Sequence, residues 1–173
     1  MATYPTIYAG QRITSALLTS MLPIAAFKAA NTDRTATTTL ADDPDLSVQI
    51  AANATYRVVF YLHYAATNVA RFKTAWTVPS GTTGNRAAVG PDQGVVLSST
   101  SSGGQGRWGV HNFVTACTYG TRDSSSNQCF AQEEATIFTT AAGTLAIQWA
   151  QVTSDASVAR LAAGSSMHVQ RLA

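Results

Sequence analysis

The chain has 173 residues, of which 12% are charged and 46% are apolar, and its net charge is +2. This length suits one domain with a real hydrophobic core, and the charged fraction is well below the usual value of about 25%. Ser, Thr, Asn, Gln and Gly therefore supply most of the polar surface, as is common in β-rich extracellular and virion proteins. The small net charge, without a Lys/Arg cluster, argues against a nucleic-acid partner.

The sequence also shows no membrane-spanning segment and no secretory signal. No segment approaches the roughly 20 apolar residues that a membrane helix needs. Residues 1–5 (MATYP) lack the basic region and apolar core of a secretory signal. We therefore expect synthesis in a cytoplasm, no export by the general pathway and no membrane partner.

Residues 1–34 are predicted to form an N-terminal arm used for docking or oligomerisation. Apolar residues recur at helical spacing within 11–22, and Pro23 ends the predicted helix. The narrow apolar face suits docking on a neighbouring subunit or on the sheet, with packing into the core of its own domain as the alternative. The predicted docking residues, toward a capsid or another partner, are Tyr8, Ile13, Leu17 and Met21.

Residues 35–173 are predicted to form a β-sandwich domain built of short strands. The predicted strands are residues 35–40, 46–50, 55–62, 71–78, 110–118, 131–140, 144–152, 158–162 and 167–172. Their short, regular spacing with turns between them predicts an antiparallel sandwich or barrel. Residues 42–45 (DDPD) are predicted to be a turn, and the Ser/Gly-rich residues 98–106 a mobile loop.

Motifs of enzyme chemistry are missing from the sequence. Serines are abundant, but none lies in Gly-x-Ser-x-Gly, and no phosphate-binding glycine loop is present. His63, His111 and His168 are scattered over different strands, without a carboxylate spaced to orient them. We therefore expect no enzyme activity, no catalytic residue, no metal site and no cofactor.

Two acidic groups favour structural roles. Residues 42–45 offer carboxylates to a calcium ion but lack the glycine and distal glutamate of a dedicated loop, so a solvated turn is favoured. Glu133 and Glu134 are neighbours in a strand, so their side chains point to opposite faces and cannot act as an acid/base pair. We expect one to be solvated and the other to pair with Arg107, Arg122 or a neighbouring chain.

Cys117 and Cys129 are the two cysteines, and they flank a polar loop at 118–128. If they face each other across the base of a hairpin, a disulfide would add about 3 kcal/mol of stability in the chain-entropy model. Two thiols are the alternative, favoured while the protein stays in a reducing cytoplasm. The sequence leaves both states open.

Aromatic residues are spread over many strands, and most are expected in the core or in subunit interfaces. Exposed aromatic rings near loops can stack on sugar rings. Tyr64, Trp108 and Tyr119 lie next to predicted loops and are the candidate glycan contacts.

An ordered set of segments carries a family resemblance. The segments are 13–23 (ITSALLTSMLP), 39–46 (TLADDPDL), 51–56 (AANATY), 75–81 (AWTVPSG), 143–151 (GTLAIQWAQ) and 163–165 (AGS). In this order the chain resembles small virion structural proteins of tailed phages infecting actinobacteria, of the capsid decoration, minor tail or fibre type. The likeness covers nearly the whole chain and is weakest between residues 87 and 107.

The resemblance implies a jelly-roll-like antiparallel β-sandwich that assembles as a homotrimer on the virion in the host cytoplasm. It lends no catalytic residue. The expected function is capsid decoration, with the major capsid protein as partner and the N-terminal arm making much of the contact. The alternative is a minor tail or fibre-head protein that binds a host-surface glycan.

Overall fold

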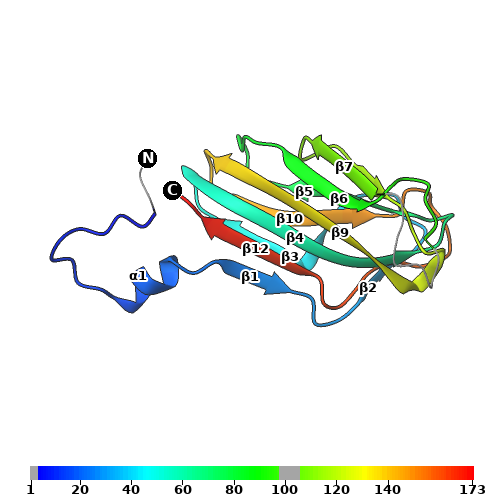
Figure 1. Ribbon diagram of the computed structural model, residues 1–173, viewed down its shortest axis with the longest axis horizontal. Coiled ribbons are helices and arrows are strands. Elements are labelled where there is room, and N and C mark those ends of the chain that lie inside the picture. The colour runs from blue at the N-terminus through cyan, green and yellow to red at the C-terminus, as the bar shows by residue number, and fades with distance from the viewer. Residues whose placement is uncertain (1–3, 98–105) are drawn as a thin grey trace.

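A computed structural model describes residues 4–97 and 106–173 of the chain (Figure 1). It contains an antiparallel β-sandwich preceded by an N-terminal arm with one short helix, which confirms the predicted fold class. The predicted loop at 98–106 lies outside the described residues, apart from Gly106 at the start of a strand.

Twelve strands and one helix make up the described parts of the chain. In chain order they are α1 (Ser15–Ser20), β1 (Ile24–Phe27), β2 (Thr32–Arg34), β3 (Ala41–Ile50), β4 (Ala54–Ala66), β5 (Phe72–Thr77), β6 (Arg86–Pro91), β7 (Gly106–His111), β8 (Cys117–Tyr119), β9 (Ser124–Thr139), β10 (Gly143–Ala150), β11 (Ala159–Leu161) and β12 (Ser166–Arg171).

The strands form two sheets, which we call the larger and the smaller sheet. The larger sheet has the order β1-β12-β4-β9-β6-β7, with β11 pairing to β4 and β2 pairing to β11. These strands lie side by side in Figure 1, from β7 at the top to β1 below. The smaller sheet has the order β3-β10-β5-β8.

Strict alternation along β4 explains how the larger sheet covers the core. Tyr56, Val58, Phe60 and Leu62 are buried, while the residues between them face outward. Phe60 meets Trp76 of the smaller sheet edge to face, with ring centroids 4.8 Å apart. Such aromatic pairs add about 0.5–1.5 kcal/mol beyond the area that they bury.

The acidic segment 42–45 is not the solvated turn predicted from the sequence, because it lies inside β3. The Asp43 carboxylate accepts the backbone N–H groups of Asp45 and Leu46, at 3.1 and 3.2 Å. Pro44 is tolerated because β3 is the edge strand of the smaller sheet, so no neighbouring strand needs its missing N–H. The predicted strand at 35–40 is irregular chain in the structure.

The predicted strand at 110–118 is two strands in different sheets. β7 ends at His111 in the larger sheet, and β8 begins at Cys117 in the smaller sheet. The chain crosses between the sheets in the residues that join them. The polar segment predicted as a loop at 118–128 overlaps the start of β9, which begins at Ser124.

The structure places the end of the arm earlier than residue 34. β1 pairs with β12 and β2 pairs with β11, so the segment from Ile24 onward belongs to the larger sheet. The predicted helix at 11–22 is the shorter α1, capped by Thr14, whose hydroxyl accepts the N–H of Leu17 at 3.2 Å. No helix in the described part of the chain has the length and apolar character to cross a membrane.

Candidate functional site: the N-terminal arm and its anchor

Residues 4–23 leave the sandwich and return to it at the end where the C-terminus lies (Figure 1). The Tyr4 N–H donates to the carbonyl of Leu172 at 3.3 Å, and the Arg171 guanidinium lies 4.0 Å from the centre of the Tyr4 ring. Sheet pairing resumes where Ile24 faces Val169. The arm is therefore fixed at both ends and projects between them.

The projecting part exposes its apolar side chains. Tyr8 is 70% exposed and Ile13 is 64% exposed, and α1 contains no buried residue. Of the other two predicted docking residues, Met21 is exposed and Leu17 is partly buried. The alternative that this helix packs into the core of its own domain is therefore wrong.

The length of α1 adds a second argument about the arm. An isolated helix shorter than about 12–15 residues is marginal in water, and α1 has 6 residues. Fully burying one Leu, Ile or Met side chain contributes about 1.5–3 kcal/mol. A helix this short, with exposed apolar side chains, would be stabilised by binding to another surface.

A groove of about 240 Å³ separates the arm from the end of the sandwich. Thr19 and Leu22 line it from the arm, and Ile50 and Tyr56 line it from the sandwich. Thr19 and Leu22 therefore lie near the end of the sandwich, with this groove between them and the sheets.

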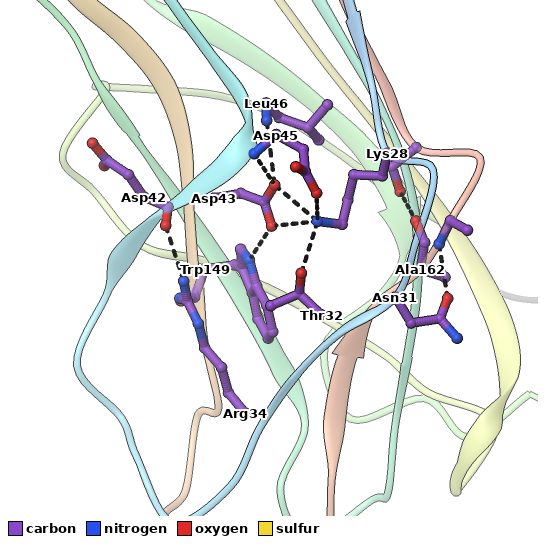
Figure 2. Close-up of polar contacts among 12 residues, drawn as sticks. Lys28, Asn31, Thr32, Arg34, Asp42, Asp43, Asp45, Leu46, Trp149 and Ala162 are labelled. Carbon is purple, nitrogen blue, oxygen red and sulfur yellow. Dashed lines mark hydrogen bonds and ion pairs between the residues drawn. The ribbon is translucent and has the colours of Figure 1, made fainter.

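Lys28 anchors the base of the arm, directly after β1. Its side chain is buried, and Figure 2 shows the ammonium pointing at oxygens of Asp43, Asp45 and Thr32. It donates to both carboxylate oxygens of Asp43 at 3.0 Å, to Asp45 at 2.7 Å and to the Thr32 hydroxyl at 2.9 Å. Since Asp43 and Asp45 belong to β3, this ion cluster ties the larger sheet to the smaller one.

Asp43 and Trp149 extend the anchor into the core. The indole N–H of Trp149 donates to Asp43 at 3.1 Å, and the Arg34 guanidinium lies 4.0 Å from the centre of the Trp149 ring (Figure 2). Burial lowers the pKa of the Arg34 guanidinium from its ordinary value, an effect opposed by Asp43 and Asp42. The acidic segment therefore holds a lysine ammonium where the sequence suggested a solvated turn or a calcium ion.

A second buried ion pair joins the two sheets around Glu133. The carboxylate accepts the indole N–H of Trp76 at 2.6 Å and the Tyr119 hydroxyl at 2.7 Å. Thr74 and Arg86 also donate to it. Burial and the Glu133 carboxylate raise the pKa of Tyr119 well above its ordinary value. With four donors and no exposed surface, Glu133 is a structural acid rather than a catalytic one.

The two glutamates behave as the strand alternation predicted, but with different partners. Glu134 is partly exposed and pairs with Arg57 at 3.3 Å. Glu133 pairs with Arg86, whereas the sequence pointed to Arg107 or Arg122. Arg86 and Lys28 were missed as partners, although a single cation inside an apolar segment was a usable signal for both.

The disulfide left open by the sequence is not formed. Cys117 lies in β8 of the smaller sheet and Cys129 in β9 of the larger sheet, and both are buried thiols. β8 pairs with β5 and β9 pairs with β4, so the expected hairpin does not exist. Burial raises the pKa of the Cys129 thiol, which contacts the Tyr64 hydroxyl.

Two of the three candidate glycan contacts are wrong, because Tyr64 and Tyr119 are fully buried. The Tyr64 hydroxyl donates to the carbonyl of Gly120 at 2.6 Å. Its burial could have been predicted, since it has the same phase as Tyr56 and Phe60 in the alternating strand. Trp108 is 76% exposed and remains a candidate.

Within residues 4–97 and 106–173, no three His, Cys, Asp or Glu side chains come together in a group that could hold a metal ion.

Comparison with known proteins gives distant structural likeness alone. No protein-family model matches the sequence, and no curated protein matches it. One similar structure is the tripod (BppUct-A-L) from the baseplate of bacteriophage Tuc2009, at 9% identity, 99% coverage of this chain, 75% of that chain and a TM-score of 0.37. Another is infectious bursal disease virus, Gx strain, at 10% identity, with 87% and 36% of the two chains covered and a TM-score of 0.22.

The VP2 subviral particle of infectious bursal disease virus gives similar values. The identity is 9%, the coverage is 87% of this chain and 41% of that chain, and the TM-score is 0.21. Because the TM-scores of these structures are below 0.5, the fold rests on the strand pairing described above and the function on the residues of this chain.

Proposed function

We propose that this chain is a structural protein of a virus particle and that it attaches to the particle through its N-terminal arm. Within that class we propose a capsid decoration protein that forms trimers on the shell. The observation that carries the proposal is the arm, fixed at both ends and exposing Tyr8, Ile13 and Met21. The resemblance of the sequence to virion proteins of tailed phages supports the location, and the actinobacterial host stays a prediction.

The sandwich supports a role in assembly more than a role in chemistry. In the described residues, the two buried carboxylates, Asp43 and Glu133, are each held by a buried cation. Neither is open to a substrate, and an acid or base must reach the proton that it transfers. The polar groups that an enzyme would present in a pocket are used here to join two sheets.

The arm also suits a shell mechanically. A decoration trimer bridges neighbouring shell subunits and so opposes the internal pressure of packed DNA. A stable specific contact buries about 1,200–2,000 Å² in total. An extended segment with its apolar side chains turned outward reaches such an area with few residues, while the sandwich stays above the shell.

Deleting residues 2–22 tests the proposal. We expect the deletion variant to fold and to form trimers, as judged by its melting temperature and by light scattering, but not to bind purified particles. A matched control carries Val69→Gln and Val114→Gln, which change exposed apolar residues on loops outside the arm. Particle binding by the deletion variant, or its loss in the control, would overturn the role of the arm.

A tail or fibre-head location is the second candidate, and the exposed Trp108 is the observation that keeps it open. Copy number separates the two locations, because decoration needs many copies on each particle and a tail needs few. Quantitative mass spectrometry of purified particles gives this number. A low copy number would exclude decoration and leave the arm as an attachment segment in the tail.

A further inference from the structure

The outward face of the larger sheet carries a row of six residues, four of them aromatic or apolar, that crosses six strands. Strand register places Phe27, Ser166, Tyr61, Gln132, Val89 and Trp108 in line, from β1 through β12, β4, β9 and β6 to β7. Because neighbouring strands lie about 4.8 Å apart, the row spans about 24 Å. Phe27 is 71% exposed at one end and Trp108 is 76% exposed at the other.

The rings in this row are held in place. Tyr61 packs against Phe130, with ring centroids 4.4 Å apart. The Trp108 indole lies over the backbone of Gly106, where an added Cβ would come within 2.7 Å of the ring. A side chain at position 106 would collide with the indole as it stands, and most of the Trp108 side chain remains in solvent.

A polar trough runs alongside this row, and we call it the outer-face trough. One hollow of about 340 Å³ is lined mainly by Arg57, Asn85, Val110, Glu134 and Thr136. A second hollow of about 230 Å³ is lined by Pro23, Arg57, Val59, His168 and Gln170. Since Arg57 lines both, the two hollows are neighbours on this face of the sheet.

The groups in the outer-face trough match a neutral ligand with many hydroxyls. Arg57 and Glu134 lie 3.3 Å apart, so their charges balance while both side chains remain partly exposed. Arg57 can donate and Glu134 can accept, and Asn85 and Gln170 can do both. A sugar hydroxyl also donates and accepts, so it can bond to neighbouring groups of both kinds.

We propose that the outer-face trough and the row beside it bind an extended neutral oligosaccharide. Its hydroxyl edges would meet Arg57, Glu134 and Gln170, and the apolar C–H faces of its rings would stack on Trp108 and Tyr61. Binding sites of this kind combine apolar and aromatic walls with a few placed polar groups. The proposal goes beyond attachment through the arm and holds for either location on the particle.

A second copy of the chain fits this face less well. The cores of protein interfaces are depleted of charged residues, and a flat partner would bury Arg57 and Glu134 at the middle of the face. Taking such a pair out of water costs several kcal/mol for each ion unless new hydrogen bonds replace the lost ones. A nucleic acid is disfavoured because Glu134 cancels the positive charge of Arg57.

Tryptophan fluorescence provides a direct test, because Trp76 and Trp149 are buried and Trp108 is the third tryptophan of the chain. The full-length protein is titrated with chito-oligosaccharides and with fragments of mannan, β-glucan and galactan, and heparin serves as an anionic control. We expect at least one neutral oligosaccharide to shift the emission and to bind in calorimetry. Trp108→Ala and Arg57→Met should each raise its Kd at least tenfold, with melting temperatures unchanged.

Val114→Ala, on a loop outside this face, is the matched control and should bind as the unchanged protein does. The proposal is overturned if no neutral oligosaccharide of the panel binds at millimolar concentration, or if both variants bind like the control. It is also overturned if Trp108→Ala lowers the oligomer mass in light scattering, since the face would then be a subunit interface. Because arm deletion leaves this face in place, failure here is separate from failure of attachment to the particle.

Discussion

The sandwich and the N-terminal arm differ in where their side chains find partners. In the sandwich even the buried charges are matched within the chain, as Glu133 by Arg86 and Asp43 by Lys28. In the arm the apolar side chains, such as Ile13, meet solvent. Most of the stability therefore comes from the sandwich, while the arm carries exposed apolar surface without a partner in this chain's core. Substitutions in the sandwich should lower the free energy of unfolding, and substitutions in the arm should weaken binding to particles.

The largest effect on stability is expected from Arg86→Met. The variant leaves the Glu133 carboxylate buried without its cation, and breaking such a pair typically costs about 3–5 kcal/mol. Chemical denaturation measures the free energy of unfolding. The double variant Arg86→Met/Glu133→Leu should recover part of the loss, because it removes the unpaired charge. A loss below about 1 kcal/mol in the single variant would contradict this account of the pair.

A somewhat smaller effect is expected from Lys28→Met, at about 2–4 kcal/mol. Asp45 is partly exposed and remains hydrated, while Asp43 keeps its bonds from Trp149 and from the backbone. Amide hydrogen exchange should rise first in β1, because the Lys28 ammonium holds the end of this strand to β3 of the smaller sheet. Equal protection of β1 in the variant and the unchanged protein would show that strand pairing alone anchors the arm.

The arm itself should contribute little to the stability of the domain. Ile13→Gln, Leu18→Gln and Met21→Gln change exposed side chains, and such substitutions usually alter the free energy of unfolding by less than about 0.5 kcal/mol. Binding to purified particles should nevertheless be lost, because the docking surface is changed. A marked fall in the melting temperature of the triple variant would show that the arm also stabilises the domain, contrary to the difference between the two regions.

The sequence was most informative where structure depends on local pattern. The alternation at 55–62 predicted β4, and apolar spacing predicted a helix before Pro23, because both depend on neighbours along the chain. The helix is shorter than predicted, since α1 ends at Ser20. The acidic segment 42–45 was misjudged because Asp and Pro favour turns, although an edge strand such as β3 also tolerates Pro. What decided the outcome was a distant cation, Lys28, which local patterns do not reveal.

The candidate functional residues could likewise be predicted only where they depend on local sequence pattern. Apolar spacing suggested Ile13, Leu17 and Met21 as docking residues, which stays a prediction, and the structure adds that Ile13 and Met21 are exposed. The outer-face trough escaped prediction because Arg57 and Glu134 come from different strands, β4 and β9, and come together only through sheet register. Register is set by long-range pairing.

The smallest effect concerns Asp33 and Arg160, which pair across β2 and β11 near the sandwich edge at 2.7 Å. The hydrogen bond from Arg160 lowers the pKa of the Asp33 carboxyl below its ordinary value. The pair therefore stabilises the fold above the unfolded pKa of about 3.9, and this contribution is lost as the pH falls through the folded pKa. Because the pair is largely exposed, its value is at most about 1 kcal/mol.

Asp33→Asn tests whether this exposed pair contributes less to stability than the buried pairs do. Urea unfolding at pH 7 should show a loss of less than about 1 kcal/mol in the variant, and the difference from the unchanged protein should shrink below pH 4, where the native carboxyl takes up its proton. Added salt should shrink it as well, since an exposed pair is screened. If the difference instead persists at low pH and high salt, the bidentate geometry of Arg160 stabilises β2 through its hydrogen bonds rather than its charge, and this edge pair would then resemble the buried pairs of the core.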